Sequence, residues 1–273
     1  MTVEHDTPEL PAMHPESVFT HALVGVDGTE AGFEACRQAG VLVEPEGPLD
    51  LVFAVETALA VHTGLSAPRI AAEMEREGAD ALTAAAEIVG RRASPRLIRG
   101  APTATLLREL ERTGASLLAV GSHGHRRIAE MMLGGVAGEL LHRAPCSVLV
   151  ARRPADEALF PRSLLVGVDG SAEAERALAV ARYLAMRFAV PLRIVTALRD
   201  SDADLPRIHL HTPFGEEIDE RPVDALQKAS ADVDLLIVGS RGLHGARALG
   251  SVSERIAHRA GCSVLVVRGP ELR

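Results

Sequence analysis

Two copies of one sequence pattern make up this chain, and the repeat constrains the fold more than any other feature. The residues LVGVDG occur at 23–28 and again at 165–170. The segments HRAPCSVLVARRP (142–154) and HRAGCSVLVVRGP (258–270) agree at 10 of 13 positions. A repeat of this length excludes a solenoid of short units and indicates two copies of one domain.

The second copy is shorter than the first. The LVGVDG markers are 142 residues apart (165 − 23), whereas LLAVGSHG (117–124) and LLIVGSRG (235–242) are 118 apart (235 − 117). The closing segments are 116 apart (258 − 142). The second copy therefore lacks 24 residues in its middle and two more in the loop that follows GSRG.

Composition predicts where each copy begins and ends along the chain. Residues 1–19 contain three prolines and no apolar periodicity, which predicts a loose N-terminal tail. The segment 154–162 contains two prolines and mixed charge, which predicts a linker. The expected domains are therefore 20–153 and the shortened copy 163–273.

Composition and charge exclude several classes of protein. The formal charge of −8 (29 − 37) and the scarcity of aromatic residues argue against a general binder of nucleic acid or anionic membranes. The sequence has no run of 18 apolar residues, and its acidic N-terminus does not resemble a signal peptide. Three cysteines in so long a chain indicate free thiols in a reducing compartment, so we expect a cytoplasmic protein.

Apolar runs of strand length alternate with helical periodicity in both copies. The run SLLVGV suits a parallel strand that is buried on both faces, and apolar residues recur every three to four positions from Ala177 to Phe188. Strands that alternate with helices imply parallel sheets covered by helices on both faces. The expected strands are 20–26, 49–54, 95–99, 116–121, 147–151, 163–168, 192–197, 233–238 and 263–267, with helices at 69–89, 222–231 and 252–260 among others.

The deletion in the second copy removes the helix that corresponds to 69–89. About nine residues remain between the strand that ends at Ala197 and the alternating segment that begins at Arg207. A parallel crossover needs a dozen or more residues. Residues 207–212 are therefore predicted to form an antiparallel or irregular sheet edge.

The repeated polar motifs follow the first and fourth strands of each copy. Asp27 and Asp169 come after the first strand, at the sheet edge where open α/β folds bind ligands. A glycine loop that leads into a helix offers unpaired amide groups and the positive end of the helix dipole, so phosphate is the expected ligand. This motif reads Gly121-x2-Gly124-x9-Gly134-Gly135 in the first copy and Gly239-x2-Gly242-x7-Gly250-Ser251 in the second.

A purely structural explanation of these residues stays open. Glycine after a buried strand is common turn chemistry, and Ser251-Val-Ser-Glu254 fits a helix capping box without any ligand. The motif is not a Walker A loop, because the chain has no GK[ST], and the dinucleotide fingerprint would follow the first strand instead. Spacing alone therefore leaves phosphate binding and turn formation as equal alternatives.

The motifs together resemble those of the universal stress protein family in its tandem two-domain form. The resemblance rests on GVDG after the first strand, the glycine pattern after the fourth and the closing strand PCSVLV, and it covers about 20–153 and 162–270. It implies two repeated Rossmann-like, adenine nucleotide alpha hydrolase-like α/β domains. Each would have an open parallel sheet of strand order 3-2-1-4-5, on which the family's nucleotide-binding members hold ATP.

The same resemblance implies an ATP site in each copy. Asp27 and Asp169 would lie beside the ribose and phosphates, the strand ends at Ala54 and Ala197 would line the adenine pocket, and the glycine motifs would cradle the phosphates. The expected ATP-binding residues are Gly25, Asp27, Ala54, Gly121, Gly124, Gly134 and Gly135 in the first copy, and Gly167, Asp169, Ala197, Gly239, Arg241, Gly242, Gly250, Ser251, Val252 and Ser253 in the second.

Two departures from the family pattern distinguish the copies. Gly135 stands where a Ser or Thr is expected, and losing one hydrogen bond to a charged group costs about 1.5–3 kcal/mol. The second copy keeps Ser251, but its loop is two residues short and it lacks the helix that would shelter a nucleotide. The sequence does not rank the two sites.

No catalytic constellation accompanies the expected site. Each copy offers one aspartate and no second carboxylate at a motif position, whereas a hydrolase needs a placed base and usually a metal. We therefore expect no enzyme activity beyond slow ATP hydrolysis, and no metal site. His209 and His211 alternate along an expected edge without a third ligand, so an exposed strand face is the preferred interpretation.

The remaining histidines, arginines and cysteines admit ordinary structural roles. Loop residues near the glycine motifs could contact phosphate, although a solvated loop is the preferred interpretation. These residues are His123, His125, Arg241, His244 and Arg247. The three cysteines are expected to be small buried core residues, since no Cys-x2-Cys pair supports zinc.

The last strand of each copy would be an apolar sheet edge, and such an edge invites pairing. The family resemblance suggests that the two final strands pair antiparallel and make the chain an internal pseudo-dimer. Val148 and Val150 should then lie near Val264 and Val266. The sequence leaves open whether two chains associate further.

These observations lead to one preferred function and two alternatives. The preferred function is a cytoplasmic stress-response regulator that binds ATP, with or without Mg²⁺, and acts through an unidentified protein partner. This role rests on the resemblance. The first alternative is a nucleotide-free interaction scaffold of the same fold, and the second is an enzyme that would need catalytic residues not found in the sequence.

Overall fold

The computed structural model describes residues 18–56, 67–90, 93–123, 133–152, 154, 159–198, 207–211, 217–218, 222–240 and 251–269. For residues 67, 196–198, 207–211, 217–218 and 251 it describes the backbone alone. Within these ranges no helix combines the length and the apolar character that a membrane span requires.

The first copy alternates strands and helices from its beginning to its end. Its elements are β1 (Ala22–Val26), α1 (Glu30–Leu42), β2 (Leu49–Val55), α3 (Ala67–Val89), β3 (Ala93–Arg99), α4 (Pro102–Thr113), β4 (Leu117–Gly121), α5 (Gly135–Arg143) and β5 (Ser147–Ala151). The second copy starts in the same way and then departs from the pattern. Its elements are β6 (Leu164–Val168), α6 (Ala172–Phe188), β7 (Leu192–Leu198), β8 (Arg207–His211), β9 (Glu217–Ile218), α7 (Pro222–Ala229), a 3-10 turn (Ser230–Asp232), β10 (Leu235–Gly239), α8 (Ser251–Arg259) and β11 (Ser263–Val267).

One continuous sheet runs through both copies, in the order β3-β2-β1-β4-β5-β11-β10-β6-β7-β8-β9. The first copy has the predicted parallel order 3-2-1-4-5. In the second copy β11, β10, β6 and β7 repeat positions 5, 4, 1 and 2 in parallel. β8 then pairs antiparallel with β7, which confirms the predicted antiparallel pairing for residues 207–211, although the two-residue β9 and not β8 ends the sheet; residue 212 lies outside the described residues. The shortened connection is the physical reason, because it is too short for a parallel crossover.

The two copies meet where β5 pairs antiparallel with β11. The register places Val148 opposite Val266, Leu149 opposite Leu265 and Val150 opposite Val264, so the predicted internal pseudo-dimer is confirmed. All of these side chains are buried. The pairing covers the two apolar strand edges that would otherwise be open.

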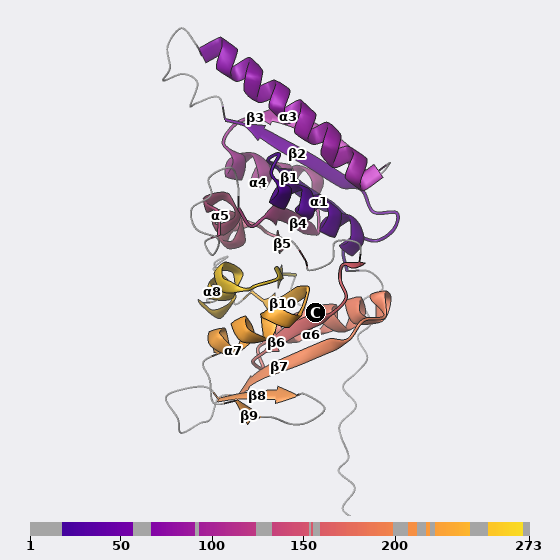
Figure 1. Cartoon of the computed structure of the whole chain (residues 1–273), viewed down its shortest axis with the longest axis vertical. Coiled ribbons are helices and arrows are strands. Elements are labelled where there is room, and N and C mark those ends of the chain that lie inside the picture. The colour runs from indigo at the N-terminus through magenta and orange to yellow at the C-terminus, as the bar shows by residue number, and fades with distance from the viewer. Residues whose placement is uncertain are drawn as a thin grey trace, which may run out of the picture.

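Helices cover both faces of the sheet (Figure 1). They enclose two hydrophobic cores, and each core extends across the β5–β11 pairing, which we call the seam. One core joins α4 and α5 to α7 and α8, and the other joins α1 and α3 to α6. Alternate residues of the seam strands enter opposite cores: Val148 and Val264 face the first, and Leu149 and Leu265 face the second. The two copies therefore share their hydrophobic interior.

Helix α3 belongs to the first copy and lies along β2 and β3 at one end of the molecule (Figure 1). Its face toward the sheet includes Ala81, Leu82 and Ala85, which are buried in the core. Gly78 of α3 lies so close to the ring of Phe53 that an added Cβ would stand 2.7 Å from it. The 24-residue deletion removes the counterpart of this helix from the second copy.

Cys36 and Cys262 are buried, as predicted, whereas Cys146 is partly exposed and packs against the core. Burial raises the pKa of Cys36 and of Cys262 to about 12, and that of Cys146 to about 11. In the unfolded chain each thiol would lose its proton near the ordinary value of 9.0. Between pH 9 and 11 the unfolded state therefore binds fewer protons than the native state, and stability falls as the pH rises.

We expect each thiol to lower the free energy of unfolding by up to about 1.4 kcal/mol per pH unit, a limit approached above pH 9 once the unfolded thiol is ionised. A hydrogen bond to Glu44 and burial also raise the pKa of Tyr183, which acts in the same direction. Urea unfolding at pH 8, 9, 10 and 10.5 measures the slope, and Cys36→Ala should remove up to about 1.4 kcal/mol per pH unit of it at the upper end of this range. An unchanged slope in that variant would contradict the burial argument.

Candidate functional site

An aspartate at the end of β1 organises the turn into α1. Asp27 Oδ1 accepts hydrogen bonds from the Thr29 amide (3.0 Å) and the Thr29 hydroxyl (2.6 Å). The hydroxyl oxygen of Thr29 accepts in turn from the Gly32 amide (3.1 Å) and caps the helix. Gly28 between them has φ +77°, a conformation that favours glycine.

The second copy repeats this turn almost atom for atom. Asp169 Oδ1 accepts from the Ser171 amide (3.1 Å) and hydroxyl (2.6 Å), and Ser171 caps α6 through the Ala174 amide (3.2 Å). Gly170 has the same φ of +77° as its counterpart. Both predicted aspartates are thus fixed at the carboxyl edge of the sheet by their own turn.

Two of the glycines that are predicted to bind phosphate are required by packing, whether or not a ligand binds. A Cβ on Gly121 would lie 2.7 Å from the backbone carbon of Ala31, and one on Gly239 would lie 2.5 Å from that of Glu173. Each glycine thus lets the end of the fourth strand touch the first turn of the helix that follows the aspartate. This packing role needs no ligand.

The glycines of the first strands also have a packing role. A Cβ on Gly25 would lie 3.0 Å from a methyl carbon of Leu106, and one on Gly167 would lie 3.3 Å from Leu226. Leucines of α4 and α7 therefore occupy the space that these glycines leave. A nucleotide-binding role for either glycine stays a prediction.

The N-terminus of α5 differs from these positions, because no described side chain caps it or fills the space beside it. Gly134 is its N-cap residue, no side chain caps the helix, and the Gly134 amide donates to the Ser122 carbonyl (2.9 Å). Among the described residues, a Cβ built on Gly135 would meet no atom within 4 Å. A hydroxyl-bearing residue would fit here, so its absence leaves space at the place where the glycine motif predicts an anion.

The corresponding helix of the second copy is held differently. The buried Ser253 donates its hydroxyl proton to the Gly239 carbonyl (2.6 Å), and Val252 packs against the core. These contacts give both residues a structural role beside the predicted one. α8 begins at Ser251, which makes this serine the first helical residue, whereas the capping-box alternative requires it as the N-cap residue before the helix.

Several predicted residues cannot be placed. Those outside the described residues are Gly124, His125, Arg241, Gly242, His244, Arg247 and Gly250. The described backbone places Ala54 opposite Ile98 near the end of β2, and Ala197 opposite Ile208 near the end of β7. His209 and His211 lie at alternating positions of β8.

His123 is partly buried, which differs from the solvated position that the sequence favours. Its Nδ1 lies 2.9 Å from the hydroxyl oxygen of the buried Ser122, and its buried Nε2 has no hydrogen-bond partner within the described part of the chain. Burial and the nearby charge of Arg152 lower the pKa of its ring. The loop after β4 therefore begins with a neutral imidazole packed against the protein.

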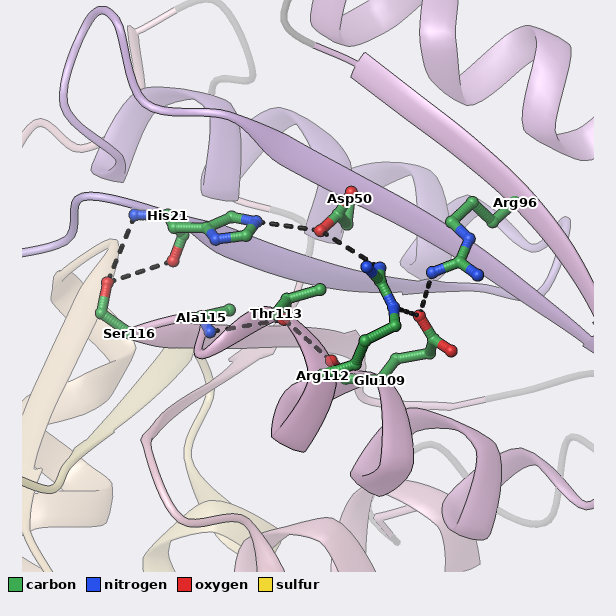
Figure 2. A network of polar contacts seen from close by, with 8 residues as sticks. All are labelled: His21, Asp50, Arg96, Glu109, Arg112, Thr113, Ala115 and Ser116. Atoms are coloured by element: carbon green, nitrogen blue, oxygen red, sulfur yellow. Dashed lines mark hydrogen bonds and ion pairs between the residues drawn. The ribbon is translucent and has the colours of Figure 1, made fainter.

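A second polar cluster, which the sequence did not indicate, lies at the amino ends of the first-copy strands, on the side opposite the candidate site (Figure 2). His21 Nε2 lies 2.9 Å from Asp50 Oδ2, and Arg112 Nη2 lies 4.0 Å from the same oxygen. The buried Glu109 accepts from Arg112 Nε (2.7 Å) and also pairs with Arg96. Because this edge is opposite the carboxyl ends of the strands, the cluster stabilises the domain away from the candidate site.

Comparison with known proteins places the chain among related sequences and folds. A family model described as the universal stress protein family matches residues 19–152 and 212–268. Universal stress protein Rv2005c of Mycobacterium tuberculosis is 31% identical over 90% of this chain and 96% of its own length. Universal stress protein Rv2623 of the same organism is 28% identical over 90% of this chain and 95% of its own.

A solved structure supports the same grouping at the level of the fold. The crystal structure of a universal stress protein from Archaeoglobus fulgidus superposes with a TM-score of 0.68 at 22% sequence identity. The match covers 93% of this chain and 97% of that one. The likeness therefore extends over both copies.

Proposed function

Because the chain belongs to the universal stress protein family, we propose that it is a stress-response regulator that binds ATP in its first copy with little or no turnover. The observation that carries the proposal is a chain of short contacts that links Asp27 to the N-terminus of α5. The two are joined by short contacts: Asp27 lies against Gly32, Gly32 against Gly121, and Ser122 accepts from Gly134. A carboxylate that can accept from ribose hydroxyls thus stands near a helix end that attracts phosphate.

The position of α3 favours the first copy over the second. Helix α3 reaches the turn after β1, where a Cβ on Gly28 would lie 3.4 Å from Ala81. It therefore covers the flank of the site, and the deletion removes its counterpart from the second copy.

The described part of the site favours binding rather than hydrolysis. Asp27 already uses Oδ1 to fix the turn, and His123 is a packed imidazole instead of a placed base. A regulator of this kind would signal by being occupied or empty. Its location in the cytoplasm stays a prediction.

The test begins with the purified chain, which is denatured so that any bound nucleotide can be identified and counted by chromatography and mass. We expect one ATP per chain, either released in this way or bound on titration of the emptied protein. Turnover with Mg²⁺ and ATP should fall below about 1 s⁻¹, the lower end of ordinary enzyme rates. An absence of binding at millimolar ATP would overturn the proposal.

The two aspartates offer a matched pair of variants. Asp27→Ala should weaken ATP binding by about 10- to 100-fold, because a hydrogen bond to a charged group is worth about 1.5–3 kcal/mol. Asp169→Ala removes the same turn contacts from the second copy and should leave the affinity unchanged. Calorimetric titration measures both. Equal losses in the two variants would contradict the assignment to the first copy.

A second candidate function, a nucleotide-free scaffold, is favoured by the packing roles of the glycines. Gly25, Gly121, Gly167 and Gly239 all have steric reasons that need no ligand. The scaffold and the regulator share the fold and differ in the ATP titration. A chain that binds no nucleotide would be assigned to the scaffold.

A further inference from the structure

An arginine follows the last strand of each copy and reaches across the seam. Arg152 follows β5, and its guanidinium donates to the carbonyl oxygen of Ala257 (2.5 Å) in the last turn of α8 and to that of Cys262 (3.2 Å), just before β11. Its backbone amide donates to the hydroxyl of Ser263 (3.0 Å). The first copy therefore caps the C-terminus of the last helix of the second.

Arg268, which follows β11, makes the reciprocal contacts. Its guanidinium donates to the carbonyl oxygens of Leu141 and Ala144 at the end of α5. Its amide donates to the hydroxyl of Ser147 (3.0 Å). The two arginines are 116 residues apart (268 − 152), the spacing of the closing repeat, so the arrangement has pseudo-twofold symmetry.

The carbonyl groups of the helix ends balance the charges of these arginines. Neither guanidinium is within ion-pair distance of a carboxylate in the described ranges, and burial lowers the pKa of both. A helix C-terminus carries a partial negative charge and unpaired carbonyl groups, both of which favour a cation. Each arginine therefore stabilises the C-terminus of the last helix of the opposite copy.

Helix α5 joins one of these caps to the candidate site. It has nine residues, so its ends are about 13 Å apart. Gly134 and Gly135 at one end face the expected phosphate, while Leu141 and Ala144 at the other receive Arg268. A tilt of so short a helix at its C-terminus would displace its N-terminus by a similar amount.

We infer that Arg268 of the second copy is a positioning residue that holds the phosphate-facing end of α5 in the first copy. The inference rests on the proposed function, because it assigns a support to the site proposed there. It means that the second copy is required for full ATP affinity of the first, even when it binds no nucleotide itself.

The test compares ATP with adenosine, which lacks the phosphates. Removing the support should weaken contacts to phosphate and spare contacts to the base and ribose. We expect Arg268→Met to raise the Kd for ATP about tenfold, a loss in the range of a helix-end charge in a partly buried site, with little change in the Kd for adenosine. Arg268→Lys keeps the charge and should restore part of the ATP affinity.

Two controls separate positioning from general damage. Arg259→Met changes an exposed arginine of α8 and should leave both affinities unchanged. In the ligand-free protein, hydrogen exchange should quicken in α5 for Arg268→Met and in α8 for Arg152→Met. This crossed pattern would support the reciprocal capping without reference to any nucleotide.

The outcomes can be distinguished from failure of the proposed function. If the wild-type chain binds neither ATP nor adenosine, the proposed function fails, and the inference fails with it. If the wild-type chain binds ATP and Arg268→Met loses ATP and adenosine affinity equally, the inference alone is overturned. Should Arg268→Met not fold, Arg268→Lys decides the question by the same ratio of affinities.

Discussion

Leu265→Asp should lower the free energy of unfolding by at least about 5 kcal/mol, enough to unfold a domain of ordinary stability. Leu265 lies opposite Leu149 at the centre of the β5–β11 pairing, and both side chains are fully buried (0% exposed). The substitution removes a buried side chain and places a carboxylate where no cation faces it in the described core. Because both cores cross the seam, the damage reaches both copies.

Leu159→Asp provides the matched control for this prediction. It makes the same chemical change at a residue that is 60% exposed, so the expected effect is within about 0.5 kcal/mol. Urea unfolding followed by circular dichroism measures both variants. A loss of only about 1 kcal/mol for Leu265→Asp would show that the two halves keep their folds without the seam.

Gly239→Ala should destabilise the chain by about 3 kcal/mol, the upper part of the range for an overpacked core. The added Cβ would lie 2.5 Å from both the carbon and the oxygen of the Glu173 carbonyl, so the backbone of α6 must move. The first turn of α6 is the turn that Asp169 and Ser171 fix. The variant therefore disturbs the helix start as well as the packing.

Gly135→Ala is the control, because nothing lies within 4 Å of its added Cβ. Alanine is a better helix former than glycine, so this variant should be neutral or more stable by about 0.5–1 kcal/mol. Thermal unfolding compares the two substitutions directly. If both glycines tolerated alanine equally, the close approach of β10 and α6 would not be the reason for Gly239.

The sequence predicts the sheet well because repeats and periodicity report directly on buried strands and helices. Runs such as SLLVGV correspond to observed strands, and the shortened connection correctly predicts the antiparallel β8. The pairing of β5 with β11 was also foreseeable, since an apolar edge invites pairing and the family resemblance suggests that the two final strands pair with each other.

The site could be predicted only in part, because residue types do not reveal which backbone groups come together. The aspartates lie where the strand pattern places them, but Gly121 and Gly239 proved to have steric roles that spacing alone cannot distinguish from phosphate binding. The capping contacts of Arg152 and Arg268 are to carbonyl groups more than 100 residues away, which carry no side-chain signal.

The seam inside a single chain also changes what mutation can do to the molecule. In a symmetric dimer of identical subunits, every substitution appears on both sides of the axis at once. Here each side is encoded separately, so one half can change while the other is preserved. His142 contacts Glu254 across the seam (3.3 Å). The residue equivalent to Glu254 in the first copy is Gly138 (254 − 116), which has no carboxylate, so His258 cannot make the equivalent contact. The same freedom allows the described part of the second copy to lack a counterpart of α3, while the first copy keeps this helix over β2 and β3.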